Sequence, residues 1–194
     1  YSDKLKENAE TACKSFVNKF MNEAGYLYDY IDGNYKDLNV RPNMIFAVSL
    51  PYSPLGKRQK KSVLDFVTKE LLANCGLRTL SPKSDRFRPH YNGSENDKKF
   101  AYFNGMAFPW LFGAYIEAYL NLFQLSGLSL AERIIVNMEN ELQNDCIGSI
   151  SEFYDSNPPF IAHGGYSFAM SVAELLRAKK IISSYNTENV DIKK

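Results

Sequence analysis

Apolar residues recur along this 194-residue chain with the period of about 3.6 residues that is typical of amphipathic helices. The pattern predicts six helices, over residues 3–22, 43–50, 60–74, 106–123, 130–144 and 166–183. Long polar connections lead into the second, fourth and sixth helices, over residues 23–42, 75–105 and 145–165. Short connections leave the second and fourth, over residues 51–59 and 124–129. The residues that could carry chemistry lie almost entirely in the long connections.

The distribution of apolar residues around the helix also alternates from one predicted helix to the next. In the first, third and fifth, apolar residues such as Leu130 and Ile134 keep to one stripe, which indicates an outer helix with a solvated face. In the second, fourth and sixth they run nearly all the way round, as at Leu111 and Phe112, which indicates burial on most sides. Alternating outer and inner helices build a double-layered toroid. We therefore predict an all-α single domain over residues 1–194, with three helical hairpins and the long connections on one face.

Composition limits the class of ligand. With 45% hydrophobic residues the chain can bury one core, and it has no apolar run long enough to span a membrane. Its 23 basic and 22 acidic residues leave a net charge of +1, which argues against nucleic acid or an anionic membrane as a partner and favours a neutral ligand. Cys13, Cys75 and Cys146 are scattered, which favours core or helix-end thiols in a reducing, cytoplasmic setting.

The first residue, Tyr1, is not methionine, and no secretory signal follows it. The sequence enters an amphipathic helix almost at once, near Ser2. Three hairpins make only part of a closed ring. We therefore expect this chain to be a piece of a longer protein whose further hairpins precede it.

Aromatic residues make up 14% of the chain, and several lie in the long connections beside polar residues, as Tyr28 and Tyr30 lie beside Asp29. Sugars have apolar faces edged with hydroxyl groups, so aromatic rings mixed with carboxylates, amides and arginines suit them. The alternative is that the rings are core residues, which is the better interpretation for those inside helices.

Glu152 is the first candidate for chemistry. It lies in a segment, residues 147–155, that is typical of a short strand and is followed by the rigid turn of Pro158 and Pro159. A carboxylate at the mouth of the ring could activate water, or it could be a structural glutamate paired with an arginine of a neighbouring loop. Asp29 and Asp32 precede the turn residue Gly33, where they could bind sugar hydroxyls or cap the turn; the pattern favours the turn for Asp32.

Other chemistries have weaker support. His90 and His163 belong to no short metal-ligand motif, and no glycine-flanked serine elbow is present. We therefore predict neither a metal nor a cofactor.

Six segments together resemble the C-terminal glucosidase domain of glycogen debranching enzymes. They are residues 28–33, 41–51, 76–82, 102–110, 148–152 and 171–178, and they follow one another in the right order along nearly the whole chain. The resemblance implies an (α/α)6 toroid, of which this chain is the C-terminal half. It also implies hydrolysis of α-1,6-linked glucose, at the branches of glycogen or a related α-glucan, with inversion.

The same resemblance implies roles for individual residues. Glu152 falls where the family places its general base. An inverting hydrolase needs a second carboxyl group about 6.5–9.5 Å away as general acid, and in the family that acid lies upstream of the position of Tyr1. The isolated chain is therefore expected to be inactive. The residues expected to contact sugar are Asp32, Arg41, Asn43, Arg78, Tyr102 and Asn104.

Four positions depart from the family pattern. Phe103 replaces a histidine and Phe108 a tryptophan, while Phe168 and Met170 stand where relatives tend to have glutamine and tryptophan. Each change removes a polar or indole group. The changes leave two interpretations open: a hydrolase with a divergent α-glucan substrate, or a non-catalytic carbohydrate-binding or scaffold remnant. A protein-interaction helical array is a third, but polar loops gathered on one face favour a pocket.

Overall fold

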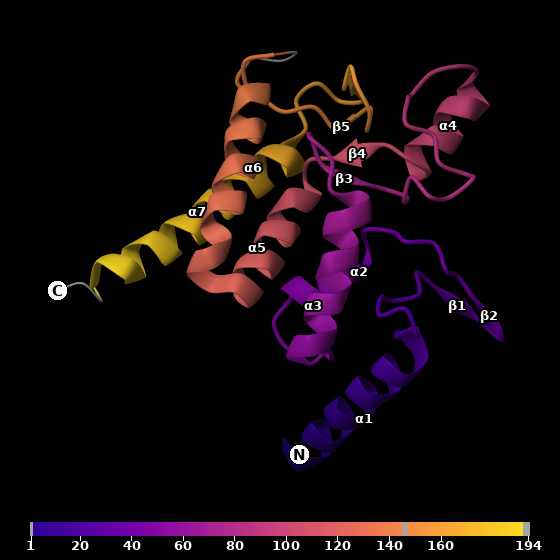
Figure 1. The fold of residues 1–194 in the computed structure, drawn as a ribbon, viewed down its shortest axis with the longest axis vertical. Helices are drawn as coiled ribbons and strands as arrows, with labels where there is room; N and C mark the ends of the chain where they lie inside the picture. Colours follow the sequence, from indigo (N-terminus) through magenta and orange to yellow (C-terminus); the bar gives the residue numbers. More distant parts are fainter. Residues whose placement is uncertain (1, 145–146, 192–194) are drawn as a thin grey trace.

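The computed structural model describes residues 2–144 and 147–191, and it is mostly helical with two small sheets (Figure 1). The helices are α1 (Ser2–Phe20), α2 (Met44–Ser49), α3 (Lys57–Phe66), α4 (Glu95–Phe103), α5 (Leu111–Phe123), α6 (Leu128–Glu141) and α7 (Ala169–Asp191). A π-helical turn, Val67–Leu71, extends α3, and a 3-10 turn, Gln124–Gly127, joins α5 to α6. Of the three cysteines, Cys75 is buried and Cys13 is half-buried, while Cys146 lies outside the described residues.

Helix α5 is the centre of the helical core. It packs against α2, α3, α6 and α7, and eight of its residues are buried, which confirms the predicted burial on most sides. The prediction that this helix begins at Met106 was wrong. Pro109 disfavours helical geometry at the residue before it, so Ala107–Phe108 forms strand β4 and the helix begins only at Leu111.

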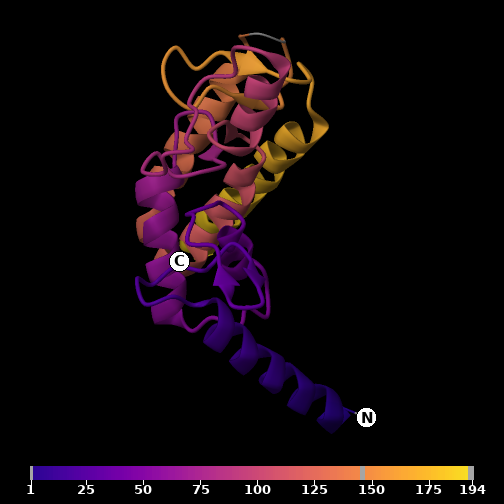
Figure 2. The same cartoon turned by 90° about the vertical axis from the view of Figure 1, so that its right-hand side faces the viewer.

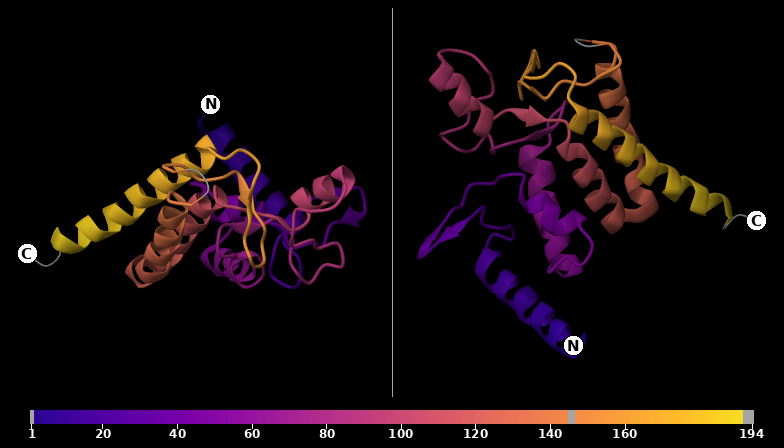
Figure 3. Two further views of the ribbon diagram at one scale, coloured as in Figure 1. Left: turned by 90° about the horizontal axis from the view of Figure 1, so that it is seen from above. Right: turned by 180° about the vertical axis from the view of Figure 1, so that it is seen from behind.

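The other two predicted inner helices differ from each other. Helix α2 is buried at four of its six positions, as expected. Helix α7 is not buried on most sides: Leu175 and Ala178 face the core, whereas Leu176 is 64% exposed. Among the described residues, α7 packs mainly against α5 and α6, which it crosses (Figure 3). Helix α1 has no buried residue and projects from the rest of the molecule (Figure 2).

Both sheets are built from the long connections. Strands β1 (Ile31–Asp32) and β2 (Tyr35–Lys36) form an antiparallel hairpin whose turn contains Gly33 at φ 56°. Strands β3 (Leu77–Arg78), β4, β5 (Phe153–Tyr154) and β6 (Ala162–His163) form an antiparallel sheet in that order. Of the strand predicted over residues 147–155, only Phe153–Tyr154 is present, as β5, paired to β4 through Tyr154 and Ala107.

The three long connections meet, as predicted. The amide of Ser81 donates to the carbonyl of Val40 at 3.0 Å, and the amide of Tyr91 donates to Asp155 at 2.8 Å. Helix α4 lies inside the second connection and was missed, because its apolar stripe is weak. Its start carries a local signal, since Ser94 and Asp97 form a reciprocal capping box. Within the described residues, no helix combines the length and apolar character needed to cross a bilayer.

Candidate active site

Glu152 is held by two uncharged donors. The hydroxyl of Tyr102 donates to its Oε1 at 2.9 Å, and the amide of Gly165 donates to its Oε2 at 3.1 Å. Its own amide donates to the carbonyl of Gly165 at 3.0 Å, which extends the pairing of β5 with β6. No arginine or lysine among residues 2–144 and 147–191 pairs with this carboxylate. The structural alternative, a glutamate bound to an arginine, therefore does not describe its surroundings.

Tyr102 comes from the end of α4 and is fixed by aromatic packing. Its ring makes edge contacts with Phe103, Phe108 and Phe153 at centroid distances of 5.0 to 5.1 Å. Burial, together with the hydrogen bond to Glu152, raises the pKa of Tyr102 to about 12. The hydroxyl therefore stays protonated near neutral pH and donates to the carboxylate. Orientation by neutral donors leaves the carboxylate without a counter-charge, which suits a proton acceptor.

Gly164 allows the backbone to approach Glu152 closely. It has a φ of +76°, and a Cβ atom there would lie 2.5 Å from Oε2 of Glu152. At Gly165, a Cβ atom would lie 3.9 Å from the same oxygen, an ordinary contact. Only the first position therefore requires glycine.

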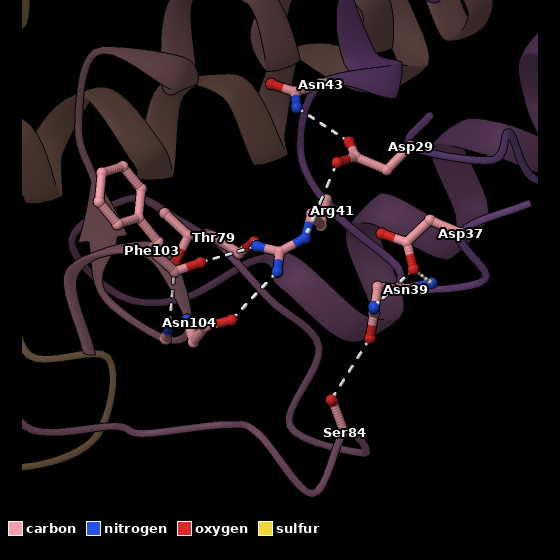
Figure 4. Close-up of polar contacts among 10 residues, drawn as sticks. Asp29, Asp37, Asn39, Arg41, Asn43, Thr79, Ser84, Phe103 and Asn104 are labelled. Carbon is pink, nitrogen blue, oxygen red and sulfur yellow. Dashed lines mark hydrogen bonds and ion pairs between the residues drawn. The ribbon is translucent and has the colours of Figure 1, made fainter. Parts of the chain in front are cut away.

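A second group of predicted site residues surrounds Arg41 (Figure 4). Its guanidinium donates to the carbonyls of Thr79 at 3.1 Å and Phe103 at 2.7 Å, and to Oδ1 of Asn104 at 3.0 Å. Its Nε lies 3.8 Å from Asp29, and the other oxygen of Asp29 accepts from Asn43 at 2.9 Å. Arg41 thus joins the first long connection to the end of α4.

The two groups are neighbours through α4. Arg41, Asn43 and Asn104 line a polar cavity of about 640 Å³, and Glu152 is not among the residues that line it. Residues 102, 103 and 104 are consecutive, and they bind Glu152 through Tyr102 and Arg41 through the other two. The end of α4 therefore fixes the carboxylate and the cavity relative to each other.

Comparison with known proteins shows the family of this chain. The family model described as amylo-alpha-1,6-glucosidase matches residues 2–177. The chain belongs to the amylo-alpha-1,6-glucosidase family. An alignment over 91 residues with glycogen debranching enzyme of Saccharomyces cerevisiae is 28% identical and covers 44% of this chain and 6% of that protein.

Solved glycosidase structures share the fold of this family member. Neutral trehalase from Saccharomyces cerevisiae aligns with a TM-score of 0.60 at 16% identity, over 93% of this chain and 32% of the trehalase chain. Mannosylglycerate hydrolase from Thermus thermophilus, solved with glucose, aligns with a TM-score of 0.58 at 14% identity, over 84% of this chain and 38% of the other. The chain thus spans about a third of the length of each.

Two of the sugar contacts expected from the amylo-alpha-1,6-glucosidase resemblance lie apart from these groups. Asp32 is exposed in the β1–β2 hairpin, opposite Tyr35. Arg78 donates to the carbonyls of Leu72 at 2.8 Å and Ser156 at 3.2 Å, and burial lowers its pKa. The geometry gives Arg78 a structural contact and Asp32 a place in a turn.

Asp155 is a buried residue whose role sequence reasoning missed. Its Oδ1 accepts from the amide of Tyr91 at 2.8 Å and lies 2.9 Å from Nε2 of His163, while its Oδ2 lies 3.1 Å from Nδ1 of His90. The two histidines thus meet at one carboxylate. The described residues contain no group of three or more histidine, cysteine, aspartate or glutamate side chains that could hold a metal ion. The sequence carried one sign of the contact between Asp155 and His163, since these two residues lie on either side of the turn at Pro158.

The departures from the family pattern fall into two kinds. Phe108 is buried in the aromatic cluster, 5.5 Å from Phe153, and so fills core space. Phe103 and Met170 are exposed, at 56% and 48%, and Phe168 is half-buried. Phe103 is among the residues that line the cavity around Arg41.

Proposed function

We propose that this chain is the C-terminal half of an (α/α)6 toroid in a glycoside hydrolase that cleaves α-1,6-glucosidic branch linkages with inversion. Its substrate is glycogen or a related α-glucan. The observation that carries the proposal is the Glu152 carboxylate, oriented by Tyr102 and Gly165 and free of any cation among the described residues. Family membership and the likeness to glycosidase folds support the class.

In this mechanism Glu152 takes a proton from water as the water attacks the anomeric carbon. The bond from that carbon to the leaving oxygen breaks on the opposite face, and a general acid protonates the leaving oxygen. We place the acid in the polypeptide upstream of this chain. Tyr102 holds the base throughout, and Arg41, Asn43 and Asn104 are proposed to contact the sugar. The exposed side of α7, around Leu176, is the surface that upstream helices would cover.

A non-catalytic carbohydrate-binding remnant is the second candidate. The exposed ring of Phe103, where the family has histidine, favours it, because it replaces a polar group beside the cavity. The two candidates differ in one feature: only a hydrolase requires an upstream carboxyl group facing Glu152.

The stereochemistry of the product tests the hydrolase. A protein that carries this chain with the upstream helices is incubated with a branched limit dextrin, and the released glucose is followed by proton NMR before mutarotation. Inversion of the α-linkage predicts that β-glucose is released first. Release of α-glucose would overturn the inverting mechanism, and absence of release would favour the remnant.

Adding a methyl group at Gly164 should lower turnover far more than adding one at Gly165. Alanine at Gly164 places Cβ against the carboxylate of Glu152 and strains a backbone with φ +76°, so we expect turnover to fall about a hundredfold. Gly165→Ala is the matched control, because its Cβ makes only an ordinary contact. Steady-state kinetics of the two variants provide the measurement. Equal losses would show that Gly164 does not position the base.

A further inference from the structure

Glu70 is a buried carboxylate next to the segments that hold Arg41. It is 6% exposed and lies in the π-helical turn Val67–Leu71, a kind of turn that is rare and frequently found at functional sites. Its Oε2 accepts from the Ser81 hydroxyl at 2.7 Å, and its Oε1 accepts from the Lys83 ammonium at 2.5 Å. A carboxylate is costly to bury unless it is hydrogen-bonded and paired with a cation, so these two contacts hold Glu70 in place.

Ser81 connects this carboxylate to Arg41. While its hydroxyl donates to Glu70, its amide donates to the carbonyl of Val40 at 3.0 Å. Val40 directly precedes Arg41 in the chain. The guanidinium of Arg41 in turn donates to the carbonyl of Thr79 at 3.1 Å, two residues before Ser81 (Figure 4). The backbone and the side chain of this arginine are therefore both held by the segment that Glu70 fixes.

The groups around Glu70 keep it ionised. Burial alone raises the pKa of a carboxyl group, but the hydrogen bonds from Lys83 and Ser81 outweigh it and hold the pKa of Glu70 below its ordinary value. The charges of Lys83 and Lys69 act in the same direction. Tyr26 also interacts with Glu70, and burial followed by that negative charge raises the pKa of Tyr26, so its hydroxyl stays neutral. The contacts of Glu70 are thus kept at neutral pH and lost only as the pH falls through its lowered pKa.

We propose that Glu70 is a positioning residue for substrate binding, which acts through Ser81 and Val40 to hold Arg41 in the orientation that contacts the sugar. The inference rests on the proposed function for the role of Arg41. Glu70 does not line the cavity around Arg41, so it touches no ligand there. Arg41 binds the sugar both before and during bond cleavage, so losing its orientation weakens substrate binding and leaves the chemical step nearly unchanged.

The kinetics of Glu70→Gln test this role, in a protein that carries this chain with the upstream helices. The NH2 group that replaces one oxygen cannot accept a hydrogen bond, so one of the contacts with Ser81 and Lys83 is lost. We expect KM for a branched limit dextrin to rise about tenfold and kcat to change less than about twofold. Glu139→Gln is the matched control, because Glu139 pairs with Lys179 between α6 and α7. Thermal melting verifies that each variant folds.

The pH dependence of KM provides a second test that keeps Glu70 itself. The side chain of Lys83 is 68% exposed, so Lys83→Met removes the cation with little effect on the core. Burial of Glu70 then acts with less opposition, although Lys69 and Tyr26 remain, and its pKa should rise. The increase of KM toward acid pH should therefore begin at a higher pH than in the parent. Lys83→Arg should keep the parental profile, and so should the control Lys179→Met.

Reaction of Arg41 with phenylglyoxal, followed by mass spectrometry without substrate, separates this inference from the proposed function. Three hydrogen bonds hold the guanidinium in the parent, and Glu70→Gln should make it react severalfold faster. An unchanged KM, an unchanged reactivity of Arg41, or a fall in kcat alone in folded Glu70→Gln would overturn the positioning role. If Glu70→Gln does not fold, an unshifted pH profile of Lys83→Met would overturn it. If the parent hydrolysed no α-1,6-linked glucan while Arg41 reacted faster in Glu70→Gln, the proposed function would fail and the positioning of Arg41 by Glu70 would stand.

Discussion

Glutamine in place of Glu152 should lower turnover of an α-1,6-linked glucan about a hundredfold to ten-thousandfold, in a protein that joins this chain to its upstream helices. The amide keeps the size of the side chain. It can still accept a hydrogen bond from the Gly165 amide, and the Tyr102 hydroxyl can accept from it in turn. It cannot take a proton from water. The loss should therefore appear in kcat, with KM nearly unchanged.

Azide provides a control for this variant. A small anion needs no base to attack the anomeric carbon, so added azide should partly restore the rate and yield a glycosyl azide. Turnover near the parental value would show that Glu152 is structural and that the base lies elsewhere. The isolated chain should be inactive even with Glu152 intact, because we place the general acid upstream of it. Clear activity from it would mean that a carboxyl group within this chain serves as the general acid.

The helical core could be predicted because its signal is local. The all-round apolar pattern of residues 111–123 has one stable solution, burial on most sides, and α5 has it. The apolar run at residues 172–176 also predicted burial on most sides, yet Leu176 is exposed, because a local pattern does not specify which neighbours cover each face of a helix. Helix α4 could not be found from periodicity. Its polar sequence is held by the cap at Ser94 and by contacts with segments far away along the chain.

Some parts of the candidate site could also be predicted from the sequence, and others could not. Glu152 could be proposed as the base from the family resemblance, but its two donors could not be predicted, because Tyr102 is 50 residues away and reaches it only when α4 and the β4–β5 pairing are in place. The group around Arg41 needs the first connection to meet the end of α4, 62 residues further on. Nothing local in the sequence marks Asp155 as buried. Its burial follows from the sheet register, which turns the carboxylate toward His90 and His163.

Substitution of Asp155 is expected to have the second large effect, on both stability and turnover. It ties together the two segments that hold Glu152. On one side it binds the amide of Tyr91, whose segment leads into α4 and so to Tyr102. On the other it binds His163, which precedes Gly165 by two residues. Both donors to Glu152 are therefore positioned through one buried carboxylate.

Replacing Asp155 with alanine should lower the free energy of unfolding by about 3 kcal/mol, because three hydrogen-bonding groups lose a charged acceptor and the site is buried. Asp155→Asn is the matched control. Its amide oxygen can still accept from Tyr91, and its NH2 group can donate to a histidine in the other tautomer, so about 1 kcal/mol should be lost. Urea unfolding of both variants measures these values. Turnover should fall with alanine even at temperatures where the variant is fully folded, because the two donors to Glu152 are then no longer tied to each other. A folded alanine variant with parental kcat would show that Asp155 stabilises the loops without positioning the base.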